Sequence, residues 1–272
     1  MTIERYKLRA WWGERRETIP GCAESFRAFV NALPGIDPIF LNWLSGKPRI
    51  RPLFPVPISL DDATRFVERN QARYDSPRRV WPERGYRLSG WNAGPPGTAP
   101  PDAPQNADFV GSTRVRTGGY ASQNPHHNSV EIVLSKKRLK TRQPWLASEL
   151  RPLMKLVLSV WRPRELSVDC NRYFDFKPSV ADPRYAPTKR VLPPGAVLLT
   201  TGDRLLLPWV GWLTYLPADL AAKVTLPSDI EVERLGDGGI IATLCEEPFT
   251  IDNPVHMARA RAMEAAIRTV QT

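Results

Sequence analysis

The sequence contains few of the residues that build covalent or metal-bound frameworks. Three of its 272 residues are cysteines. Cys22, Cys170 and Cys245 are an odd set at wide spacing without a CxxC pair, which argues against both a disulfide framework and a thiolate zinc site. A reducing compartment fits this cysteine content best.

Histidine is equally scarce. His126 and His127 are neighbours in the loop sequence QNPHHNS, with no acidic residue near them, and His256 stands alone. Adjacent loop residues rarely both ligate one metal with good geometry, so a solvated loop is favoured over a metal site. The sequence predicts no metal and no cofactor.

Catalytic motifs are also lacking. The sequence has no GxSxG, GxGxxG, P-loop, HExxH or EF-hand pattern. The paired acids Asp61 and Asp62 open a predicted helix, where the positive end of the helix dipole favours them. Glu246 and Glu247 precede a proline in a turn, and a hydrolase that uses them is the alternative with the least support. No enzymatic activity is expected.

No apolar run is long enough to cross a bilayer. The longest, residues 205–216, is interrupted by Pro208, and the N-terminal sequence MTIERYKLRA is charged and lacks the apolar core of a signal peptide. These features predict a cytoplasmic protein that does not enter a membrane.

Positive charge, by contrast, is abundant: the formal net charge is +10 and the pI is near 9.8. Such a surplus is compatible with nucleic acid, an anionic membrane or an acidic partner. The clearest candidate for contacts with phosphate is the run KKRLKTR, with Lys136, Lys137, Arg138, Lys140 and Arg142. A solvated turn is favoured there, and a basic nucleic-acid-binding protein is the alternative function.

Hydrophobic periodicity predicts many strands and few helices. Period-two patterns indicate strands at 6–12, 86–91, 109–116, 129–134, 166–170, 196–201, 210–216, 230–235 and 240–244. Helical stripes begin at Pro20, Leu60, Leu146 and Pro254. There is no regular β-α alternation, so the prediction is a single α+β domain over residues 1–272, with a mainly antiparallel sheet, a few packing helices and long Pro-rich loops. The Pro-rich segment 92–106 is expected to be exposed and mobile.

Charge is distributed unevenly along the chain. Residues 227–252 carry seven acids and one base, a local net charge of −6. In the strand pattern, Glu231 and Glu233 alternate with Ile230, Val232 and Arg234 and share a face with Asp229, so an acidic ridge is predicted. An equally supported alternative is a solvated face whose carboxylates meet the chain's own arginines.

The order of several motifs adds a family resemblance. AWWGERRE is followed by GYRLSGWNAG, NSVEIVL, VGWLTYLP, GDGGIIAT and EPFTIDNPVHMARARAMEAAI. Together they resemble the immunity protein 52 family of bacterial polymorphic toxin systems, over residues 6–267. The resemblance implies a cytoplasmic α+β protein that binds a cognate secreted toxin, often a restriction-endonuclease-like nuclease delivered by a type VI or similar secretion system. The strongly basic net charge departs from the usual acidic inhibitor of a nuclease.

The resemblance also implies a characteristic tryptophan and glutamate, which fall on Trp11 or Trp12 and on Glu14 or Glu17. We interpret WWGERRE as a structural hinge with contact residues, in which Trp12 is buried against the first helix through Phe26 and Val30. Inhibition by occlusion of the toxin's active site and by a change in its oligomeric state are both compatible with the sequence. The candidate toxin-binding residues are Glu14, Glu17, Asp229, Glu231, Glu233, Asp237, Glu246 and Glu247.

Overall fold

The computed structural model describes residues 5–45, 51–73, 79–94, 110–120, 128–170 and 210–271. Three expectations from the sequence lie outside these residues: the strand at 196–201, the pair His126 and His127, and the Pro-rich segment from residue 95 to residue 106.

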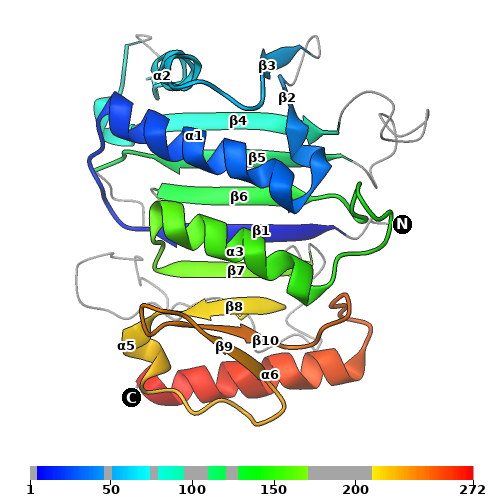
Figure 1. Cartoon of the computed structure of the whole chain (residues 1–272). Coiled ribbons are helices and arrows are strands. Elements are labelled where there is room, and N and C mark those ends of the chain that lie inside the picture. The colour runs from blue at the N-terminus through cyan, green and yellow to red at the C-terminus, as the bar shows by residue number, and fades with distance from the viewer. Residues whose placement is uncertain are drawn as a thin grey trace.

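The centre of the fold is one antiparallel sheet of ten described strands (Figure 1). The strands are β1 Tyr6–Trp12, β2 Asn42–Leu44, β3 Pro52–Phe54, β4 Tyr86–Ala93, β5 Gly111–Thr117, β6 Asn128–Leu134, β7 Glu165–Cys170, β8 Leu213–Leu216, β9 Glu231–Arg234 and β10 Ile240–Thr243. Their order across the sheet is β3-β2-β4-β5-β6-β1-β7-β8-β10-β9. The predicted α+β class with a mainly antiparallel sheet is therefore confirmed.

Two long helices lie side by side across one face of this sheet (Figure 1). The described α-helices are α1 Ile19–Ile36, α2 Leu60–Arg69, α3 Ala147–Trp161, α5 Ala218–Ala221 and α6 Pro254–Arg268, with short 3-10 turns at Pro38–Leu41, Pro82–Arg84 and Thr269–Gln271. α1 packs against both α2 and α3, and α6 lies at the end of the sheet formed by β8, β10 and β9 (Figure 1). No described helix is long and apolar enough to span a membrane.

The first strand and the first helix form where their patterns predict. In β1 the side chains of Leu8, Ala10 and Trp12 are buried, and the residues between them are partly exposed. Thr18 caps α1 by accepting a hydrogen bond from the Gly21 amide, and Pro20 occupies the first turn, where its missing N–H costs nothing. The predicted apolar stripe of α1, from Cys22 to Leu33, is fully buried.

Two strands were not expected from the sequence. β2 and β3 each have three residues, which is too short for an alternating pattern to be recognised. They are positioned by tertiary contacts, because Trp43 of β2 is buried against the rings of Phe26 and Phe54. The strand predicted at 210–216 begins later, at Leu213.

The two faces of the central sheet differ in character. Trp12 of β1 stacks on Trp161 of α3, so the buried side chains of β1 face the helices. Since side chains alternate along a strand, Lys7, Arg9 and Trp11 lie on the opposite face. That face points away from the viewer in Figure 1.

Candidate functional site

The WWGERRE turn connects β1 to α1 and is held by the neighbouring strand ends. The Arg15 amide donates to the Gly119 carbonyl at 2.9 Å, and the Asn128 side chain donates to the Gly13 carbonyl at 2.8 Å. Trp12 is buried, as predicted, whereas its contact with Phe26 and Val30 of α1 stays a prediction. The Trp12 ring stacks on Trp161 of α3. The Trp161 ring in turn contacts Phe29 of α1 edge-on, with ring centroids 4.6 Å apart. The turn is therefore anchored to α3 as well as to the sheet.

Glu17 points into the protein at the start of α1. One carboxylate oxygen lies 2.7 Å from Arg15 Nε, and the other accepts hydrogen bonds from the Thr117 hydroxyl and, at 3.2 Å, from the Cys22 thiol. Burial and the nearby Glu17 charge raise the pKa of Cys22 well above its usual range. Glu14, in contrast, is exposed. Of the two candidate glutamates, Glu17 has the geometry of a structural anchor and Glu14 has the position of a surface residue.

A pocket of about 330 Å³ opens beside this anchor. It is lined by Arg16, Glu17, Thr18, Ile19, Gln71, Val80, Pro82, Gly85, Tyr86, Gly118 and Tyr120. The Arg16 guanidinium lies over the Tyr120 ring at 5.0 Å, and burial raises the pKa of the Tyr86 hydroxyl. The volume is at the lower end of the range for ligand pockets, and suits one side chain of a partner.

The acids of the predicted ridge lie together, but each has a basic partner from the same chain. Glu231 lies 2.6 Å from Arg151, and Glu233 pairs with Lys155, so both carboxylates of β9 are directed at α3. Asp229 lies 3.0 Å from Arg259 of α6. Glu231 and Glu233 share one face of β9, as the alternation predicts. Their ion pairs correspond to the alternative interpretation, in which basic residues of the same chain pair with these carboxylates.

The other three acidic candidates stabilise turns and helix ends. Asp237 accepts a hydrogen bond from the Gly239 amide at 2.9 Å within the β9–β10 hairpin turn. Glu246 accepts from the Ser148 amide at 3.2 Å and from the Ser148 hydroxyl, where α3 begins. A carboxylate at this place is favoured by the helix dipole. Glu247 contacts His256, at the start of α6.

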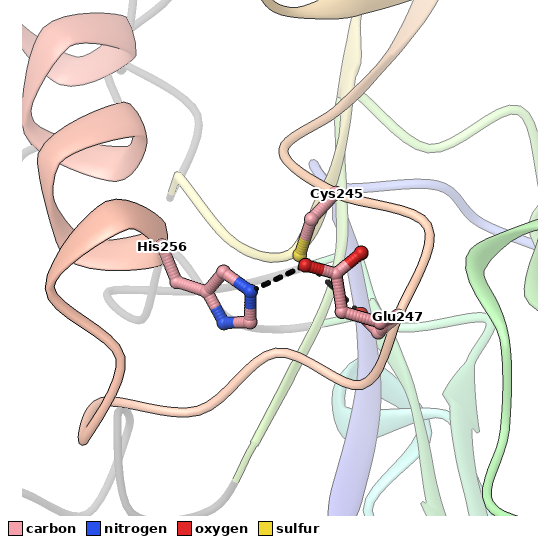
Figure 2. A group of neighbouring side chains, drawn as sticks. All are labelled: Cys245, Glu247 and His256. Atoms are coloured by element: carbon pink, nitrogen blue, oxygen red, sulfur yellow. Dashed lines mark hydrogen bonds and ion pairs between the residues drawn. The ribbon is translucent and has the colours of Figure 1, made fainter.

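Cys245, Glu247 and His256 bring three potential metal-ligating atoms within 4.8 Å of one another (Figure 2). His256 Nε2 lies 2.8 Å from a Glu247 carboxylate oxygen, and the Cys245 thiol donates to the Glu247 carbonyl at 3.3 Å. His256 is buried and stacks on Phe249, whereas Glu247 is exposed. The sequence offered no signal for this cluster, because its members are spread over a turn and the following helix.

The hydrogen bonds of His256 make this cluster a poor metal site. The Thr250 amide donates to His256 Nδ1 at 3.2 Å, so the neutral ring carries its proton on Nε2 and donates it to Glu247. A metal on Nε2 would move that proton to Nδ1, where it would face the amide proton of Thr250. Burial, with the Glu247 charge, also raises the pKa of the Cys245 thiol to about 12, so the sulfur is neither a ready ligand nor a ready nucleophile. The arrangement is that of a structural corner between the β10 strand end and α6.

The basic run 136–142 is only partly available for phosphate contacts. The side chain of Arg138 is 12% exposed, lies 3.5 Å from the buried Asp37 and also pairs with Glu149 of α3. Its guanidinium donates to the Ile36 carbonyl at 2.8 Å. Arg138 thus connects the ends of α1 and α3, while Lys136, Lys140 and Arg142 are exposed. The expectation of a solvated turn holds for the exposed members, and the central arginine is structural.

The geometry described so far defines an α+β protein whose polar clusters hold turns and helix ends in place. One family of known proteins resembles part of this chain. The immunity protein 52 family model matches residues 201–270. This confirms the resemblance for the part of the chain that includes β8, the β9–β10 hairpin and α6, and the match does not extend to the WWGERRE turn.

Solved structures and curated proteins were also compared with this chain. Among solved structures, the Pseudomonas aeruginosa T6SS protein PA0821 is similar at 14% sequence identity and a TM-score of 0.46, over 99% of this chain and 73% of that chain. A likeness this distant supports no conclusion about a shared partner. No curated protein matches the sequence significantly.

Proposed function

We propose that this protein is an immunity protein that binds a cognate antibacterial toxin and neutralises it stoichiometrically, without an enzymatic activity of its own. The observation that carries the proposal is the immunity protein 52 match over residues 201–270. The Cys245 thiol with its raised pKa and the internally paired carboxylates agree with a binding role, since none of them is poised for acid-base or nucleophilic chemistry.

We further propose that the toxin is a restriction-endonuclease-like nuclease delivered by a type VI secretion system, and that neutralisation takes place in the cytoplasm of the producing cell. A nuclease attracts phosphate with a positive groove, and an acidic surface is complementary to it. The candidate contact residues are those of the acidic ridge, Asp229, Glu231 and Glu233, with Asp237, Glu246 and Glu247 beside them and Glu14 on the WWGERRE turn. Their internal ion pairs reduce the field of the ridge, so they provide orientation more than affinity.

Co-expression tests the function directly. The toxin encoded beside this gene is produced in a susceptible host with and without this protein, and both growth and co-purification are measured. Restored growth with a stable complex is expected. Continued growth arrest, or two proteins that elute separately, would show that this chain is not the cognate immunity protein.

The nucleic-acid-binding alternative has less structural support. Its best candidate segment uses Arg138 internally, bonded to Asp37, Glu149 and Ile36. Phosphate contacts make affinity fall steeply with salt. A gel-shift titration at about 50 and 200 mM salt separates the two functions, because an immunity protein should not shift a short DNA duplex at the lower concentration.

A further inference from the structure

The sheet face that lies away from α1 and α3 carries a group of arginines on adjacent strands. In the β4–β5 pairing, Arg87 is directly opposite Arg116, and Ser89 is directly opposite Arg114. In the β5–β6 pairing, Arg114 is opposite Glu131, which is in turn opposite Arg9 of β1. We call Arg87, Arg114 and Arg116 the basic face.

These arginines are poorly compensated. Like charges directly opposite each other in an antiparallel pair are destabilising. Glu131 is shared, at 3.6 Å from Arg114 and 3.4 Å from Arg9. Among the described residues, no carboxylate lies within ion-pair distance of Arg87 or Arg116. Burial, together with repulsion from Arg87 and Arg114, lowers the pKa of Arg116.

The acidic ridge differs from the basic face in this respect. Asp229, Glu231 and Glu233 each meet a cation of the same chain, so that surface is largely neutral when the protein is alone. Arg87 is exposed and the Arg114 side chain is 56% exposed. The basic face therefore holds unbalanced charge that is available to a partner.

A large aromatic side chain extends the basic face. Trp91 is 46% exposed and lies opposite Ser112 on the same face as Arg87, four residues further along β4 and thus about 13 Å away. Tryptophan and arginine are both enriched at the energetic centres of protein interfaces. Because its backbone is held in the strand ladder, a sheet surface of this kind can dock a partner without rearrangement of the backbone.

We infer that the basic face, with Trp91, binds a carboxylate-rich surface of the cognate toxin. This rests on the proposed function, which supplies the partner, and on charge complementarity, which supplies the surface. The Glu131 carboxylate in the middle of the arginines favours a protein over nucleic acid, because it would repel a phosphate backbone but can pair with a basic side chain of a protein. The alternating charges of Arg9, Glu131 and Arg114 would also favour one orientation of the partner on this surface over others.

This surface is distinct from the acidic ridge. Glu231 and Glu233 of the ridge are directed at α3, on the helix side, whereas the basic face lies on the other side of the sheet. Six strands separate β4 from β9 in the strand order. Five strands separate β5, the other strand of the basic face, from β9. At about 4.8 Å per strand the two surfaces lie roughly 29 Å or more apart, so their contributions to binding can be measured independently.

The test compares two charge reversals of equal size. One variant carries Arg87→Glu and Arg114→Glu on the basic face. The control carries Arg27→Glu and Lys223→Glu, which are exposed residues on α1 and after α5 and change the net charge equally. The affinity of each for the purified toxin encoded beside the gene is measured at about 50 and 200 mM salt, with thermal melting to confirm folding. A neutral variant, Arg87→Ala with Arg114→Ala, is included in case the reversal does not fold.

The basic-face reversal is expected to weaken toxin binding about 100-fold at low salt, the neutral variant less, and the control less than about threefold. If the parent protects cells but all variants bind the toxin equally, the inference fails and the proposed function stands. If the parent neither binds nor protects, both fail. A third outcome is that the parent binds a short DNA duplex or RNA and the basic-face reversal loses this binding, while its toxin binding is unchanged. The surface then serves nucleic acid, and the inference is overturned.

Discussion

The indole rings of Trp12 and Trp161 stack with centroids 6.0 Å apart and planes 16° from parallel. This contact joins the last residue of β1 to the last residue of α3, two elements that are far apart in the sequence. The Arg15 guanidinium, 5.4 Å from the Trp12 ring, donates to the Trp161 carbonyl at 3.1 Å. The tryptophan of the WWGERRE motif is thus a packing residue that fastens the sheet to its helical layer.

Replacement of this tryptophan should therefore be costly. Trp12→Ala is expected to lower the free energy of unfolding by about 3–5 kcal/mol, because truncation of a large buried aromatic leaves a cavity. The exposed Trp91 supplies the control, and Trp91→Ala should cost less than about 1 kcal/mol. Urea denaturation measures both. A Trp12→Ala protein that unfolds like the parent but no longer binds toxin would identify Trp12 as an interface residue.

The two glutamates of the turn should behave differently. Glu17→Gln is expected to lower the free energy of unfolding by about 1–3 kcal/mol, because the Thr117 hydroxyl and the Cys22 thiol lose a charged acceptor. Glu14→Gln should change it by less than about 1 kcal/mol, since Glu14 is exposed. Equal stability of the two variants in urea, with toxin binding lost in Glu17→Gln alone, would make Glu17 a contact residue.

Alkaline pH should destabilise the protein through its buried acids. Burial, with the Glu247 charge, raises the pKa of Cys245 from near 9.0 to about 12. Between these values the folded state keeps the thiol proton and the unfolded state loses it, so stability is fully present below about pH 9 and falls as the pH rises toward 12. Tyr215, whose pKa burial and Asp237 raise to about 12, acts in the same direction.

Urea midpoints at about pH 8 and about pH 10 measure this effect. The parent should lose stability between them, and Cys245→Ala should lose less, because one of the groups responsible has been removed. An equal decrease in both proteins would assign the effect to Tyr215, Cys22 or other groups.

Zinc should not stabilise the protein. The Thr250 amide directs its proton at His256 Nδ1, which leaves Nε2 as the donor to Glu247 rather than as a metal ligand. A ligand that binds only the folded state raises the melting temperature, and the rise increases with the concentration of the ligand. An unchanged melting temperature with excess zinc is expected. A rise that is lost in His256→Asn would show that the Cys245, Glu247 and His256 cluster holds the ion after rearrangement.

Charge reversal on the acidic ridge should slow toxin binding. Glu231→Lys with Glu233→Lys is expected to reduce the association rate about tenfold at low salt, because it removes attraction to a positive groove. It should also lower the free energy of unfolding by about 1 kcal/mol, since the new lysines face Arg151 and Lys155. The matched control is Glu24→Lys with Glu68→Lys, two exposed acids on α1 and α2. Association at the parent's rate would remove the ridge from the interface.

The elements that the sequence predicted well are those with a local physical cause. β1 and α1 follow from hydrophobic period, from the Thr18 cap and from Pro20 in the first turn, all of which act within a few residues. The GDGG turn predicted the β9–β10 hairpin for the same reason: Gly238 adopts a positive φ of 85°, which glycine tolerates without strain. β2 and β3 were missed because three residues carry no period and are ordered by contacts with α1 and β4.

Charge partners were beyond the reach of sequence reasoning. The alternation of β9 correctly placed Glu231 and Glu233 on one face, but that pattern contains nothing about Arg151 and Lys155, which α3 brings to them from a distant part of the chain. The same holds for Arg138, which a basic run presented as a surface residue and which the fold buries against Asp37. Period and capping are local properties of the chain, so the sequence by itself determined the elements and the face that each side chain occupies. Ion pairs and open surfaces depend on which elements the fold brings together, and only the tertiary structure decided that the acids are neutralised while Arg87 and Arg116 are left facing each other.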